Sequence, residues 1–184
     1  MRPRLTAPAI GAAAALVFAS ATGAEEGFPK LNPLSPVERS LDYGLTAGCL
    51  PFLVEGGSIH ERIERSSGRT TLNGRPADRL HGRSTILIQE DGPGCYLVAP
   101  RGDPDRLREA VLATLRRVGG DPRVRFDSGP GSRDSLGAFR QESWCFAVDG
   151  RPAGLVMSTS SVRRRHAMQA SLFIDRDGAC RREP

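Results

Sequence analysis

Lysine is almost absent from this sequence. Lys30 is the only lysine among 26 basic residues, and all the others are arginines. It lies in a proline-rich stretch, residues 28–36, ahead of the part of the chain that we expect to fold. Enzymes that use a lysine Schiff base, a Ser-x-x-Lys acyl transfer or a P-loop need that amine in the folded domain. The sequence therefore excludes these three classes.

The motifs of other common catalytic and metal sites are also missing. There is no G-x-S-x-G nucleophile elbow and no H-E-x-x-H zinc helix. The three histidines, His60, His81 and His166, are far apart in the sequence, and none lies at ligand spacing from a cysteine. Residues 175–178 (DRDG) resemble the start of a calcium loop, but an EF-hand needs its glycine at the sixth position. We expect a tight turn there, and neither a metal ion nor another cofactor in the protein.

The first 24 residues have the pattern of a secretory signal peptide. Arg2 and Arg4 give a positive start, an apolar run follows over residues 9–19, and the small residues 22–24 suit cleavage after Ala24. Residues 19–21 offer an alternative cleavage point. The other interpretation is a membrane anchor, but the run is shorter than the roughly 20 apolar residues that a spanning helix needs. No cysteine follows the cleavage region, which argues against a lipid anchor.

Three parts are predicted along the chain. Residues 1–24 are the signal peptide, 25–34 a flexible proline-rich tail, and 35–184 a single disulfide-stabilised globular domain. The formal net charge of +5 falls to +3 when Arg2 and Arg4 are removed. This mild charge and the predicted export argue against a nucleic-acid partner. After cleavage no transmembrane segment remains.

Helical signals occupy the first part of the domain and the middle of the chain. A helix is predicted from Pro36, with Leu41, Leu45 and Cys49 facing the core and Pro51 ending it. A shorter helix is expected from Ser58 to near Gly68, followed by a polar loop over residues 69–82. The strongest helical pattern covers residues 104–118, where one apolar stripe should pack on a sheet: Leu107, Ala110, Val111, Thr114, Leu115 and Val118.

Strand signals dominate the rest. Residues 84–89 and 95–99 predict a two-stranded hairpin, and residues 123–126 a short strand before a flexible loop at 129–137. Residues 139–148, 153–159 and 167–174 predict a three-stranded meander, in which Trp144, Phe146 and Val148 alternate toward the core. We therefore expect an α+β fold: a mainly antiparallel sheet (hairpin plus meander), one packed central helix and two N-terminal helices.

The four cysteines of an exported chain predict two disulfides. Free thiols or a zinc site are the alternatives, but the spacings are long and no C-x-x-C pair occurs. Cys145 lies near the top of the first meander strand, and the third strand ends at the same edge, six residues before Cys180. Two strand spacings of about 4.8 Å are within reach of that tail. The predicted pairs are Cys145–Cys180 and, by elimination, Cys49–Cys95.

One charge cluster is a candidate anion site. Arg163, Arg164, Arg165 and His166 lie together in the connection between two predicted strands. Guanidinium groups bind phosphate and carboxylate through two parallel hydrogen bonds. The alternative is a solvated turn that blunts one end of the sheet. We assign no catalytic residue from the sequence.

These observations favour a small exported protein that binds without catalysis. Its partner would be a protein or an anionic component of the bacterial periplasm or envelope. One alternative is a small periplasmic hydrolase, which would hold His81 or His166 in a cleft next to a carboxylate and a hydroxyl. Another is an inhibitor of an envelope enzyme, with an exposed loop such as 128–137 at the interface.

Overall fold

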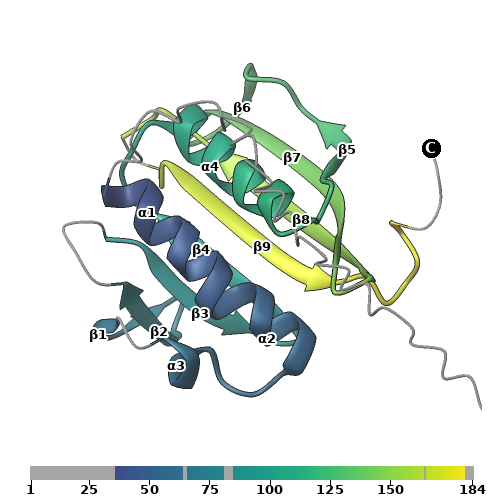
Figure 1. The fold of residues 1–184 in the computed structure, drawn as a ribbon. Helices are drawn as coiled ribbons and strands as arrows, with labels where there is room; N and C mark the ends of the chain where they lie inside the picture. Colours follow the sequence, from purple (N-terminus) through teal and green to yellow (C-terminus); the bar gives the residue numbers. More distant parts are fainter. Residues whose placement is uncertain (1–35, 64–65, 81–84, 164, 181–184) are drawn as a thin grey trace, which may run out of the picture. The chain divides into compact units, whose positions relative to one another are not determined.

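A computed structural model describes residues 36–63, 66–80, 85–163 and 165–180. The predicted signal peptide, the predicted N-terminal tail, His81 and Arg164 lie outside these residues. The described part contains helices and strands in the α+β arrangement expected from the sequence (Figure 1).

All the described strands belong to one antiparallel sheet, ordered β1-β2-β3-β4-β9-β8-β7-β5, with β6 also paired to β7. The strands are β1 Ser66–Leu72, β2 Arg75–Leu80, β3 Leu87–Asp91, β4 Gly94–Ala99, β5 Arg123–Asp127, β6 Ser132–Asp134, β7 Gly137–Val148, β8 Arg151–Thr159 and β9 Met168–Ile174.

The predicted separation into a hairpin and a meander is wrong. β3 and β4 form the hairpin, and β7, β8 and β9 form the meander, but β4 pairs with β9 from Gly94↔Phe173 to Ala99↔Met168. This pairing makes the two units one sheet. It joins segments far apart in the sequence, and no turn or local pattern predicts such a contact.

Residues 69–80 of the predicted loop 69–82 instead form two strands and a turn, and residues 81 and 82 lie outside the described residues. β1 and β2 pair from Ser66↔Leu80 to Leu72↔Arg75 around the turn Asn73-Gly74. Both turn residues have positive φ, 52° and 76°, which asparagine and glycine tolerate best. The helix expected up to Gly68 is only one turn, α3 Ile59–Arg62, because β1 starts at Ser66. A further short strand, β6, lies inside the predicted loop 129–137.

The N-terminal helix continues past Pro51, contrary to the prediction. α1 Pro36–Tyr43 leads into a π-helical segment, η1 Gly44–Cys49, and then into α2 Leu50–Glu55. The N–H of Leu50 donates to the carbonyl of Leu45, five residues back. The wider turn places Pro51 in the first turn of α2, where proline's missing N–H and fixed φ are tolerated.

Two helices cover the same face of the sheet. The N-terminal helix packs on β4 and α4 Pro104–Arg117 on β8 and β9, with β9 running between them (Figure 1). Leu41, Leu45 and Cys49 are fully buried, as predicted. A Cβ atom on Gly44 or Gly48 would come within 2.8 Å of a leucine or isoleucine of the sheet. Glycine therefore lets this helix approach the strands closely.

The core predicted around α4 and β7 is confirmed with one exception. Leu107, Val111 and Leu115 are buried against the sheet, as are Trp144, Phe146 and Val148 of β7. Val118 instead lies just beyond the last turn of α4 and is 44% exposed. None of the helices in the described ranges is long and apolar enough to cross a membrane.

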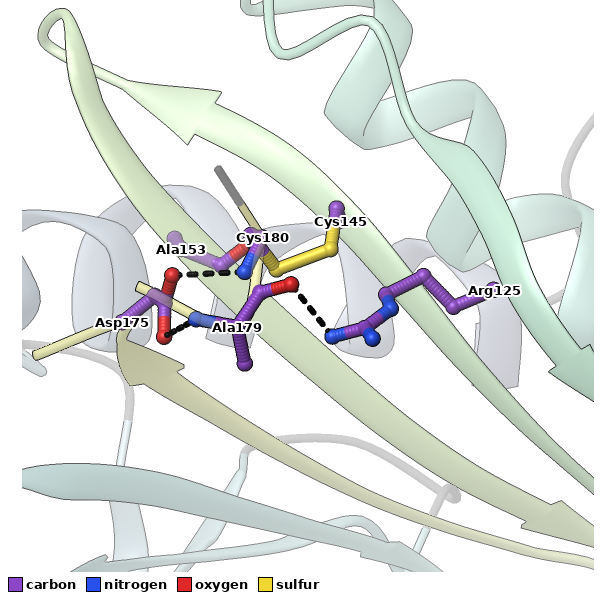
Figure 2. Close-up of a disulfide and its surroundings, with 6 residues drawn as sticks. All are labelled: Arg125, Cys145, Ala153, Asp175, Ala179 and Cys180. Atoms are coloured by element: carbon purple, nitrogen blue, oxygen red, sulfur yellow. Dashed lines mark hydrogen bonds between the residues drawn. A yellow bond between two sulfur atoms is a disulfide. The ribbon is translucent and has the colours of Figure 1, made fainter. Parts of the chain in front are cut away.

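Both disulfides connect the predicted partners. Cys49–Cys95 joins η1 to β4 in the core, with Cα atoms 5.3 Å apart. Cys145–Cys180 joins β7 to the segment after β9, and this bond is only partly buried (Figure 2). Two disulfides indicate an oxidising compartment outside the cytoplasm.

Candidate functional site

A basic cavity lies at the end of the sheet where β4 stops and β9 starts. Its volume is about 550 Å³. It is formed by residues 100–102, which follow β4, and by residues from the β8–β9 connection: Ser160, Ser161, Val162, Arg163, Arg165 and Ala167. The antiparallel pair Ala99↔Met168 explains this position, because it brings the two connections to the same edge.

The structure divides the predicted arginine cluster. Arg163 and Arg165 line the cavity, whereas the partly buried His166 is not among its lining residues. Arg164 is outside the described residues. Arg101 completes the cavity from the β4–α4 connection, and sequence reasoning missed it. Only the non-local pairing of β4 with β9 relates Arg101 to the other two.

Arg165 is held in a defined orientation. Its guanidinium pairs with Asp134 and lies 4.9 Å from the centre of the Phe139 ring. The side chain is 15% exposed, and its buried Nε has no hydrogen-bond partner in the described part of the chain. The Arg165 guanidinium, together with the Leu136 N–H at 2.8 Å, holds the pKa of Asp134 below its usual value. Arg165 therefore contributes a positive charge to the cavity wall, and its contacts with Asp134 and Phe139 hold its orientation.

Arg101 and Arg163 are exposed, and among the described residues neither has an ion-pair partner. The connection that carries Arg163 is itself ordered by hydrogen bonds. Ser160 Oγ donates to the carbonyl of Ala138 at 2.6 Å, and the N–H of Arg165 donates to the carbonyl of Val162 at 2.9 Å. The cavity therefore offers guanidinium donors on a fixed backbone, and such donors suit an oxyanion.

A second charged group, the pair of Arg108 and Glu142, joins a helix to the sheet. Arg108 of α4 donates to both carboxylate oxygens of Glu142, at 2.7 and 2.8 Å, and lies 5.4 Å from the Trp144 ring centre. Glu142 is 1% exposed. Hydrogen bonding to Glu142 raises the pKa of Arg108. Burying this carboxylate would be costly without its paired guanidinium, so the pair fastens α4 to β7.

His60 is the histidine that the structure places next to a carboxylate. Its Nδ1 lies 2.8 Å from Oδ1 of Asp78, whose side chain is 8% exposed. Both residues line a cavity of about 310 Å³ that also contains Ser58. The hydrolase alternative named His81 or His166. His81 lies outside the described residues, and His166 forms no ion pair within them. Sequence reasoning missed the pair because Asp78 fell in a predicted loop.

Within the described residues, no group of three or more His, Cys, Asp or Glu side chains is arranged to hold a metal ion. Comparison of the chain with protein-family models, with curated proteins and with solved structures gives no match.

Proposed function

We propose that this protein is an exported, non-catalytic binding protein that holds an anionic group, such as a phosphate or carboxylate, in the basic cavity. One observation carries this proposal: Arg101, Arg163 and Arg165 come from two separate connections and line one cavity. A solvated turn would spread its charges into water. Here all three residues line one cavity, and two of the three have no carboxylate partner among the described residues.

The ligand would come from the cell envelope. We propose that residues 1–24 are a signal peptide cleaved near Ala24, that the mature protein works in the bacterial periplasm or is secreted, and that the anion belongs to an envelope protein, lipid or glycan. The two disulfides support an oxidising compartment. Sequencing of the N-terminus of the secreted protein should begin near Glu25.

Binding can be tested with a charge-matched pair of variants. The double variant Arg101→Gln/Arg163→Gln removes the two unpaired charges and keeps Arg165, which is paired with Asp134. The control Arg116→Gln/Arg123→Gln removes the same charge from exposed sites outside the cavity. A charge-assisted hydrogen bond contributes about 1.5–3 kcal/mol, so the first variant should lose at least tenfold in affinity for inorganic phosphate, measured by calorimetry.

The same variants separate the sources of the anion. Vesicles containing phosphatidylglycerol test a lipid headgroup, and polygalacturonate tests an acidic glycan. Binding by the native protein and the control, lost in the cavity variant and weakened by salt, supports the proposal. Two results would show that the cluster is only a solvated turn. One is equal binding by both variants, and the other is no binding of any of these probes by the native protein.

A further inference from the structure

The cavity beside His60 lies where β2 and β3 separate. β2 and β3 pair at Asp78↔Ile88 and Arg79↔Leu87, and the N–H of Leu80 donates to the carbonyl of Ile86. None of the described pairs joins residues 75–77 of β2 to residues 89–91 of β3, and the cavity lies at this gap. Residues before and within α3 close the gap, and the N–H of Ile59 donates to Oε1 of Glu90 at 2.7 Å. The result is a cavity of about 310 Å³, walled partly by the apolar residues Ile59, Pro76 and Ala77. Its size suits a small molecule.

Asp78 fixes the hydrogen-bonding character of His60. An ionised carboxylate only accepts hydrogen bonds, so Nδ1 of the neutral ring must carry the hydrogen that Asp78 accepts. The other nitrogen, Nε2, then presents a lone pair and accepts a hydrogen bond. The imidazole is 41% exposed, which leaves this acceptor accessible.

An unpaired donor lines the same cavity. Arg69 is the cross-strand neighbour of Asp78. It is also the one charged lining residue without a partner in the described ranges, since Arg75 pairs with Asp91 and Glu90 accepts from Ile59.

We propose that this cavity binds a free α-amino acid with a small side chain. Arg69 would hold the ligand carboxylate, while His60 Nε2 would accept from its ammonium group. The carboxylates of Asp78 and Glu90 nearby favour that positive charge. The apolar wall of Ile59, Pro76 and Ala77 leaves room for a methyl or ethyl side chain. The site is independent of the basic cavity.

The test compares four ligands of similar size by calorimetry: L-alanine, propionate, ethylamine and L-lactate. L-Alanine should bind about tenfold more tightly than propionate or ethylamine, because each of these lacks one of the two charged groups. It should also shift the imidazole NMR signals of His60. Equal binding of L-alanine and propionate would overturn the proposal in favour of a plain anion site. Tighter binding of L-lactate would overturn the choice of an amino acid.

Three variants assign the roles. Arg69→Gln should abolish the binding of both L-alanine and propionate, whereas the control Arg133→Gln, on exposed β6, should change neither. His60→Phe removes the Nε2 acceptor and keeps an aromatic ring at this position. This variant should keep propionate binding and lose the preference for L-alanine. An unchanged preference in a folded His60→Phe protein, or no L-alanine binding by the native protein, would refute the proposal.

Discussion

The two disulfides use the same bond in different surroundings. Cys49 and Cys95 are 0% and 1% exposed and join the helical layer to the sheet within the main core. Cys145 and Cys180 are partly exposed and attach a short segment to the outer side of β7. The first bond connects two layers that also pack on each other. The second bond holds a segment that lies outside the sheet ladder. We therefore expect the first bond to stabilise the whole domain and the second to stabilise this segment.

Polar contacts near Cys180 support this distinction (Figure 2). The carboxylate of Asp175 accepts from the N–H groups of Ala179 and Cys180, at 3.0 and 2.7 Å. Arg125 of β5 donates to the carbonyl of Ala179 at 2.5 Å. Hydrogen bonds therefore order the outer segment locally, whereas hydrophobic packing surrounds the Cys49–Cys95 bond.

Removal of the core disulfide should have the largest effect. Cross-linking residues 46 positions apart contributes about 4 kcal/mol in the chain-entropy model. Cys49→Ala/Cys95→Ala should therefore lower the free energy of unfolding by about that amount and the melting temperature by roughly 10 °C. Denaturant unfolding followed by circular dichroism measures it. A loss no larger than that of the outer pair would contradict the comparison.

Removal of the outer disulfide should have a smaller and more local effect. In Cys145→Ser/Cys180→Ser the segment after β9 can detach while the sheet persists, so we expect a loss of about 2 kcal/mol, at the low end for disulfides. Amide exchange should accelerate at Ala179 and Cys180 before it does so in β8. Asp175→Asn, which keeps the disulfide, should accelerate the same amides less. Global destabilisation without this local exchange would show that the segment is part of the main cooperative unit.

Mild acid should have the smallest effect, again on the β7 side. Arg140, with the N–H of Gly129, lowers the pKa of Asp127, and Arg165 does the same for Asp134. A carboxyl whose pKa is lower in the folded protein stabilises it above the unfolded value of about 3.9, and this contribution is lost as the pH falls further. Amide exchange of β5 and β6 should therefore increase below about pH 4 before that of β3 and β4. Arg140→Gln should remove the part of this dependence that involves Asp127.

Local patterns were enough to predict most of the core. The spacing of Leu41, Leu45 and Cys49 and the alternation of Trp144, Phe146 and Val148 each reflect burial of one face of a single element. The disulfide pairing followed from the order of the last three strands. The helix end at Pro51 was wrong, because sequence rules for proline assume an α-helix and the π-helical turn before Pro51 removes the conflict.

The candidate sites were less predictable because they depend on contacts between distant segments. Arg163 and Arg165 were visible as a cluster, but Arg101 joins them only through the pairing of β4 with β9. The pair of His60 and Asp78 was not predicted from the sequence, for a different reason. β1 and β2 lie at the edge of the sheet and are largely polar, so their composition suggested a loop. The Asn73-Gly74 turn was the available signal for a hairpin there.

The central position of β9 has a consequence for how the chain folds. β9 is the last described strand in the sequence, yet it lies between β4 and β8 in the sheet. Until β9 is made and inserted, the sheet consists of two blocks with unpaired inner edges, and α4 lacks part of the surface on which it packs. Because a chain is synthesised from its N-terminus, the core cannot be complete until β9 has been made. Such long-range pairing slows folding, so the last described strand sets the time at which the sheet and its core can be completed.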